Sequence, residues 1–411
     1  MKEIIVLVII VILSLVGYRW TYTDTRTPKY FSPIIFSEFL YIFLGLLMGP
    51  MFLNFLDFKI LDSLTPLVLL GLGWIGILFG IQLKFSDIIR FPKSFFGVMI
   101  FSSVVPLIFV FLAFMFYFFY ISRELPTSRG VIVASVLVFA AMACCTSQST
   151  ITVVGRGLID SSKRNIIILL RYVSSLDDMV AIPLVGLAFA YEGFHTIGGE
   201  IYFRWWDVLL TTVLLGLLSG IILNFIVRIT EDKRELFLVV IGMVILSVGG
   251  ARYLNVSPLL MSAISGIVLA NMSPKQNEIM EILLLGEKPI FLIFLITIGA
   301  LLEFSPQALI VVPIYIGIRL LGKVLGGFGA SLIFKTYFEI PRNVGLGLIS
   351  QGSMAVAIAL SFSQLAPDPI GGLIIFSVAA SVLFNELLAP KAIKSVLGST
   401  GDDNRGKVGT K

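Results

Sequence analysis

Hydrophobic residues form long runs that recur along the whole chain, and short polar stretches with most of the charges separate them. An apolar run of about eighteen residues or more predicts a transmembrane helix. The pattern predicts an all-α polytopic membrane protein with about 13 spans. The predicted spans are 3–20, 33–54, 64–82, 94–119, 129–155, 165–191, 206–228, 235–251, 256–272, 282–302, 307–334, 342–364 and 369–390.

The composition of the 411 residues excludes a soluble domain, because 57% are hydrophobic and only 13% are charged. The two cysteines, Cys144 and Cys145, are neighbours inside an apolar span and do not form a disulfide framework. The basic residues are spread singly between spans, which is not the pattern of a nucleic-acid-binding surface. The sequence also has no nucleotide fingerprint and no metal-ligand cluster, so we predict a transporter without a cofactor and not an enzyme.

The distribution of Lys and Arg between the loops predicts the orientation. With the N-terminus outside, 21 basic residues fall on the cytoplasmic side, Lys288 among them, and 6 fall outside. The remaining 3 of the 30 lie within spans, and they are Arg171, Arg319 and Lys323. We therefore predict a single transmembrane unit over 1–390 and a short cytoplasmic tail over 391–411, which is polar, Gly-rich and expected to be disordered.

The strongest chemical signal is a pair of adjacent acids, Asp177 and Asp178, in the middle of the span 165–191. Ionised carboxylates are costly at this depth and mark functional sites. Two acids so close together are expected to titrate as a coupled pair. Such a pair can hold protons or exchange them for a small cation, whereas a purely structural pair would need a basic partner for each acid.

Lys323 and Arg319 are the candidate basic partners of the two aspartates. They lie four residues apart in the span 307–334, and hence on one helix face. A lysine near the middle of the bilayer must pair with an acid, lose its charge or reach a cavity. The sequence leaves open which of the two residues pairs with the aspartates. Arg171 lies nearer the cytoplasmic end of its span, where its side chain can extend to the interface.

Two spans have polar runs at their centres, which predicts helices that unwind around a binding site. The runs include Thr146, Ser147 and Thr150 in the fifth span, and Gln351, Gly352 and Ser353 in the twelfth. The two spans are seven apart, so they cross the membrane in opposite directions, as an inverted repeat requires. The alternative is that the hydroxyl groups bond to the backbone of intact helices.

Several segments together resemble the cation/proton antiporter superfamily, in particular bacterial sodium/proton antiporters with a paired-aspartate motif. The resemblance covers most of the chain and depends on the order and spacing of the segments. The matching segments are SEFLYIFLGLLMGP at 37–50, GWIGILFGIQLKFSDI at 73–88, TSQSTITVVGRGL at 146–158, SLDDMVAIPL at 175–184, KPIFLIFLITIGALLEF at 288–304 and RLLGKVLGG at 319–327.

The resemblance implies the sodium/proton antiporter fold, with two crossed, broken helices, inverted repeats and elevator-like alternating access. It also implies a homodimer in the lipid of a bacterial inner membrane. The dimerisation part is expected at 1–93 and 206–255, and the core ion-binding part at 94–191 and 256–390. By the same match, Asp178 would bind the ion and Asp177 would pair with Lys323.

The paired aspartates also imply electrogenic exchange in this family. Two positions depart from the patterns of relatives. Gln351, Gly352 and Ser353 stand where many relatives have Gly-Glu, so any role of that acid is absent. Val173 stands where electroneutral members have a glutamate, which argues against that branch.

We therefore hypothesise that the protein exchanges Na+ or Li+ for protons at Asp178 and Asp177, with Thr146, Thr150 and Ser174 as further ligands. A K+/H+ antiporter and a sodium-coupled solute symporter of the same fold are the alternatives. An intramembrane aspartic protease would need acids on two different helices, and we identify no second acid in the middle of a span. A channel fits adjacent acids and a lysine within the membrane less well than a gated, protonated site does.

Overall fold

The computed structural model describes residues 10–12, 33–121, 129–155, 161–192, 204–366 and 369–402, and within these ranges every regular element is helical. The elements are α2 (Pro33–Met48), α3 (Phe58–Ser63), α4 (Thr65–Gln82), α5 (Phe85–Ile89), α6 (Lys93–Phe116), η1 (Tyr117–Ile121), α7 (Arg129–Cys144), α8 (Gln148–Gly155), α9 (Ser161–Leu176), α10 (Asp178–Glu192), α11 (Trp205–Ile229), α12 (Lys233–Tyr253), α13 (Pro258–Met272), α14 (Gln276–Ala300), α15 (Ala308–Ile333), η2 (Val344–Leu348), α16 (Ser353–Ser363) and α17 (Ile370–Asp402).

Nine helical segments within the described ranges are long and apolar enough to cross a membrane. In hydrocarbon a backbone must satisfy its polar groups internally, which a helix does. Three further predicted spans contain shorter helices, namely α2, α13 and α16. The first predicted span, 3–20, lies outside the described residues except for 10–12, which are helical. The helical membrane architecture predicted from the sequence is therefore present.

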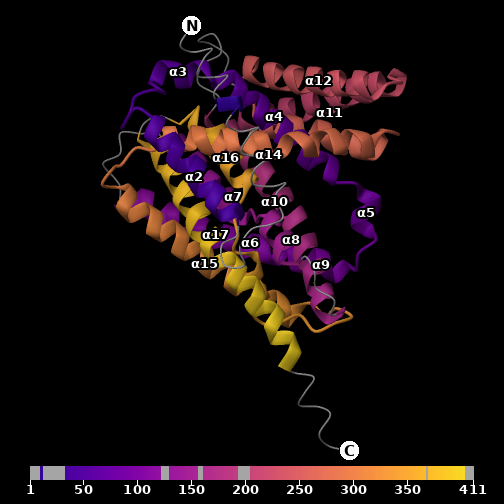
Figure 1. Ribbon diagram of the computed structural model, residues 1–411, viewed down its shortest axis with the longest axis vertical. Coiled ribbons are helices and arrows are strands. Elements are labelled where there is room, and N and C mark those ends of the chain that lie inside the picture. Colours follow the sequence, from indigo (N-terminus) through magenta and orange to yellow (C-terminus); the bar gives the residue numbers. More distant parts are fainter. Residues whose placement is uncertain are drawn as a thin grey trace, which may run out of the picture.

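The helices pack as two groups. In the first group, α13 packs against α4 and α11, α12 against α4 and α11, and α14 against α2 and α4. In the second group, α15 packs against α6, α7 against α6 and α10, and α17 against α15 and α16. Figure 1 shows α11 and α12 at the upper right, away from the lower end of α17. The first group thus contains α13 and α14.

Glycines allow the closest helix crossings of the first group. A Cβ on Gly80 of α4 would lie 2.0 Å from the carbonyl oxygen of Ala263 in α13. A Cβ on Gly299 of α14 would lie 2.1 Å from the carbonyl oxygen of Ile42 in α2. Backbones that approach so closely need residues without a side chain, as is typical of helix pairs in membranes. These contacts explain why α13 and α14 join the first group.

The last helix is longer than the sequence predicted. α17 continues past Pro390 to Asp402, so residues 391–402 are helical and not a disordered tail. Ile393 and Val396 are fully buried there. The apolar contacts of these two residues stabilise this part of the helix. The polar composition of the segment does not indicate these contacts. Residues 403–411 lie outside the described ranges.

Candidate functional site

Two helical spans are interrupted near the centre of the molecule. α7 ends at Cys144 and α8 begins at Gln148, so residues 145–147 are not helical. The second interruption covers residues 349–352, between η2 and α16. They overlap the polar runs at 146–152 and 350–353, where hydroxyl and amide groups compete with helical hydrogen bonds.

The two interruptions contact each other directly. The Ser147 amide donates to the Ser350 carbonyl oxygen over 3.2 Å, and the Ser350 hydroxyl donates to the Ser147 carbonyl oxygen over 3.1 Å. A Cβ on Gly352 would lie only 3.0 Å from the Ser147 hydroxyl oxygen. Glycine at 352 therefore lets the two segments approach. Each segment provides hydrogen-bond partners for backbone groups of the other that have no partner within their own helix.

Arg319 of α15 holds both interruptions together. Its guanidinium group donates to the carbonyl oxygens of Ile349 over 2.7 Å and of Cys145 over 2.8 Å. A longer bond of 3.3 Å reaches the carbonyl oxygen of Ser350. The side chain is fully buried. Its planar fork of donors suits several fixed carbonyl groups, so the observed partners of Arg319 are backbone groups and not the aspartates.

Lys323, one turn further along α15, contacts Asp177. Its ammonium nitrogen lies 3.6 Å from Asp177 Oδ2, and both side chains are fully buried. The same nitrogen donates to the Thr146 hydroxyl over 2.8 Å and to the Cys144 carbonyl oxygen at the end of α7. A positive charge is favourable at the carboxyl end of a helix. Lys323 thus compensates the charge of Asp177 and that of a helix end.

The two aspartates lie in different surroundings although they are neighbours in the chain. Asp177 occupies a turn between α9 and α10, and Asp178 is the first residue of α10. Asp178 lines a cavity, and Asp177 is not among its lining residues. Both oxygens of Asp177 and Oδ1 of Asp178 are buried without a hydrogen-bond partner in the described structure. Of the two carboxylates, Asp178 is therefore the one placed to meet a ligand in the cavity.

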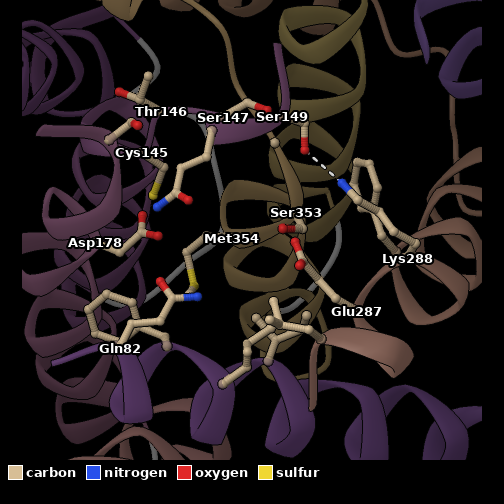
Figure 2. Close-up of a pocket in the computed structure, with 18 of the residues that line it drawn as sticks. Gln82, Cys145, Thr146, Ser147, Ser149, Asp178, Glu287, Lys288, Ser353 and Met354 are labelled. Carbon is tan, nitrogen blue, oxygen red and sulfur yellow. Dashed lines mark hydrogen bonds between the residues drawn. The ribbon is translucent and has the colours of Figure 1, made fainter. Parts of the chain in front are cut away.

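The cavity has a volume of about 110 Å³, and three acids line it together with several small polar groups, namely Glu38, Asp178 and Glu287. Figure 2 shows Asp178 on the left and Lys288 on the right, with Ser149 next to Lys288. Its polar lining includes Thr146, Ser147, Gln148, Ser149, Ser174, Asp178, Glu287, Lys288 and Ser353. Liquid water occupies about 30 Å³ per molecule, so the space suits a small ion with a few waters and not a large solute.

The predicted ligands occupy different places. Ser174 lines the cavity and donates to the Arg171 carbonyl oxygen over 3.2 Å. The Thr150 hydroxyl instead donates to Glu386 Oε2 over 2.6 Å, and Thr150 is not among the residues that line the cavity. Gln351 donates to the Met142 carbonyl oxygen over 2.9 Å and accepts from the Ser381 hydroxyl over 2.6 Å. Its contacts join α7 to α17.

The sequence analysis, which looked for acids in the middle of spans, missed two buried acids. Glu38 of α2 and Glu386 of α17 are 3% and 1% exposed. Lys288, counted with the cytoplasmic basic residues, lies within α14 and donates to the Ser149 hydroxyl over 2.6 Å. Both acids fall inside predicted apolar spans, which was the available signal, but each lies near the end of its span.

The described helices are those of a membrane protein, and the cavity between them brings the buried carboxylate of Asp178 together with small polar groups. The sequence matches the transmembrane family of sodium/hydrogen exchangers over residues 8–397, and the chain belongs to this family. The predicted membership in the cation/proton antiporters is thus confirmed, and the protein is an integral membrane cation/proton antiporter.

A solved structure supports the same fold. The sodium proton antiporter MjNhaP1 from Methanocaldococcus jannaschii at pH 8 superposes with a TM-score of 0.66 at 18% sequence identity. The match covers 95% of this chain and 98% of that one. No curated protein sequence matches the chain significantly.

Proposed function

We propose that the protein exchanges Na+, or Li+, for protons and that Asp178 is the site where they compete. The observation that carries this proposal is that Asp178 lines the cavity with one carboxylate oxygen unpartnered. The hydroxyl groups of Thr146 and Ser174 lie in the same lining. Oxygen ligands of this kind suit a hard monovalent cation.

The charges of the site explain why cation and proton exclude each other. Asp177 is compensated by Lys323 at 3.6 Å. Ionised Asp178 then leaves one negative charge in a low-dielectric environment, where it is costly. Either one proton or one monovalent cation removes this charge. Competition for a single carboxylate therefore couples the two fluxes, and the neutralised site can cross the membrane barrier.

Asp177 provides a second position for a proton, which electrogenic exchange requires. When Asp177 takes up a proton, its ion pair with Lys323 is lost, and when it releases the proton the pair forms again. An exchange of more than one proton per cation follows if this step is linked to occupancy of Asp178. The adjacency of the two acids in the chain provides that link.

We further propose that the two groups of helices move against each other in an elevator-like step. The first group, with α13 and α14 included, would form the dimerisation part, and the second group would carry the ion. The contact between residues 145–147 and 349–352 would represent the crossed, broken helices of an inverted repeat. Arg319 and Lys323 donate hydrogen bonds to backbone carbonyl oxygens at the two interruptions. These bonds would let the two interruptions move together.

The proposed setting is a homodimer in the lipid of a bacterial inner membrane, with the N-terminus outside and the C-terminus in the cytoplasm. The alternatives are K+/H+ exchange and sodium-coupled uptake of a solute. The small cavity, about 110 Å³, argues against an organic substrate, because ligand pockets usually measure about 300–1,000 Å³. Selectivity between the alkali cations depends on ligand geometry, so experiment must assign the cation.

The test uses proteoliposomes with a trapped pH dye. After a proton gradient is imposed, NaCl, LiCl or KCl is added separately to the wild type, Asp178→Asn and the control Asp62→Asn, which changes an exposed residue of α3. We expect dye recovery with Na+ and Li+ in the wild type and the control, and none in Asp178→Asn. Dye recovery with K+ alone would identify K+ and not Na+ as the transported cation. Exchange that persists in Asp178→Asn would contradict the proposal.

A further inference from the structure

A second pair of buried acids takes no part in the proposed exchange at Asp178. Glu38 on α2 is 3% exposed and Glu386 on α17 is 1% exposed. One carboxylate oxygen of each, Oε2 of Glu38 and Oε1 of Glu386, is buried without a hydrogen-bond partner in the described structure. A buried oxygen atom without a partner is costly, so each of these atoms points to a missing hydrogen atom or ligand.

The two acids interact with each other and with the same lysine. The helix of Glu38, α2, is in contact with the helix of Glu386, α17. A charge on Glu386 disfavours a charge on Glu38, and the ammonium group of Lys288 attracts both carboxylates. Lys288 is the basic residue of α14, and it also donates to Ser149 of α8 over 2.6 Å. Thr150 of α8 donates to Glu386 Oε2 over 2.6 Å.

Two further charged groups act on this pair from other positions. Arg319 of α15 attracts Glu386, and its hydrogen bonds to the carbonyl oxygens hold its guanidinium group at the two helix interruptions. Glu287 of α14 lines the same cavity as Glu38 and is only half-buried. The cluster of Glu38, Glu386 and Lys288, here called the glutamate cluster, therefore has two acids for one nearby ammonium group.

One proton balances the glutamate cluster. With both carboxylates ionised, the cluster would carry one uncompensated negative charge in a buried place, which is unfavourable. Two carboxyl groups that share a site hold a proton between them for the same reason. A metal cation needs several oxygen ligands, and only two carboxylate oxygens in the cluster lack a partner. The ligand that this chemistry favours is the proton.

The position of the cluster suggests what the proton does. α2 packs against α14 in the first group of helices, whereas α17 packs against α15 and α16 in the second, and α2 and α17 are in contact. A shared proton thus joins the two groups by a hydrogen bond, and its loss leaves like charges across their contact. Glu38 also lines the cavity that reaches Asp178, which gives the proton a route.

We propose that Glu38 and Glu386 share one proton and form a second proton-binding site, which links the two groups of helices when occupied and releases them when the proton leaves. The site is occupied at lower pH, so release accelerates exchange as the pH rises. Proton binding at this site is independent of the exchange activity, whereas its effect on the rate rests on the proposed movement of the two groups.

Infrared difference spectroscopy of the purified full-length protein tests the bound proton directly. The wild type at neutral pH should show the carbonyl stretch of a protonated carboxylic acid, and alkaline titration should remove it. Glu38→Gln and Glu386→Gln each leave one carboxylate to balance Lys288, so both variants should lose this band. Asp178→Asn and the control Glu281→Gln, which changes an exposed residue of α14, should keep it.

Thr150→Val adds a signature that does not depend on either glutamate variant. Removal of the hydroxyl group that donates to Glu386 should shift the frequency of the same band. A band that persists unchanged in Glu38→Gln or in Glu386→Gln would overturn the proposal, and so would a wild type without any band. These outcomes are independent of transport, so they stand even if the protein exchanges none of the cations tested.

Transport measurements test the effect on the rate. At saturating Na+, the maximal rate of the wild type should rise with pH, and in Glu38→Gln this rise should be reduced several-fold. The competition between Na+ and protons at Asp178 should persist in the variant, which separates the two sites. Identical pH profiles of the maximal rate in the wild type and in Glu38→Gln would refute the regulatory role.

Discussion

The ammonium nitrogen of Lys323 lies 3.6 Å from Asp177 Oδ2, and no part of either side chain is exposed. A buried ion pair contributes little net stability, but removal of one partner leaves the other charge uncompensated. The pair thus assigns the positive charge of Lys323 to Asp177 and leaves Asp178 to the cavity. This division of roles between adjacent acids is the basis of the proposed exchange.

Lys323→Ala should destabilise the protein by about 3–5 kcal/mol, because Asp177 would remain buried and charged without a partner. Asp177→Asn in the Lys323→Ala background should restore much of the loss, since it removes the orphaned charge. The measurement is chemical or thermal unfolding of the four proteins of this double-mutant cycle in detergent. Additive effects of the two substitutions would show that the charges are not coupled.

Arg319→Lys should impair both stability and transport although the charge is kept. A lysine ammonium group cannot reproduce the planar fork that reaches Ile349 and Cys145 together, so at least one buried carbonyl group would lose its partner. We expect a loss of about 1–3 kcal/mol per unsatisfied group. Arg228→Lys, at an exposed arginine of α11, is the matched control and should have little effect. Equal unfolding midpoints for the two variants would contradict the role of Arg319.

Gly80→Ala should separate α4 from α13. The added methyl group would lie 2.0 Å from the Ala263 carbonyl oxygen, and relief of such overpacking costs about 1–3 kcal/mol. Gly242→Ala is the control, because a Cβ at this position of α12 meets no atom within 4 Å. Alanine is the better helix former, so the control should be unchanged or slightly more stable. Thermal unfolding in detergent distinguishes the two glycines.

The apparent KM for Na+ should depend on pH in one direction. A proton on Asp178 excludes the cation. The KM should therefore rise by about tenfold for each unit by which the pH falls, in the range where the proton predominates, and it should be constant at higher pH. The measurement is the initial rate of exchange at several Na+ concentrations and pH values in proteoliposomes. A KM that stays constant while only the maximal rate changes would mean that the two ions do not compete for one carboxylate.

The helices and the acidic pair could be predicted from the sequence because both are local signals. An apolar run must form a helix in the membrane, and Asp177 and Asp178 stand out in such a run whatever their neighbours are. The polar runs around Ser147 and Gly352 mark the interruptions for the same reason. The family membership follows from the order of these segments and is confirmed by the match over residues 8–397.

Other features depend on contacts between residues far apart in the chain. The pattern of hydrophobic and polar residues along the sequence does not predict such contacts. The glycine crossings at Gly80 and Gly299 pack α13 against α4 and α14 against α2. The buried residues Ile393 and Val396 extend α17 into a segment that looks disordered by composition. Packing energy comes from the partner surface, so the sequence of one element alone does not show it.

By itself, the sequence determined that this protein is a helical membrane transporter with a carboxylate pair, because the cost of charges and open backbone groups in lipid acts on each span separately. Only the tertiary structure decided which charges meet. It places Lys323 at Asp177, Arg319 at the helix interruptions, and Glu38 near Glu386, which is 348 positions later in the chain. Electrostatic interactions depend on distance in space and on burial, and the packing of the helices fixes both.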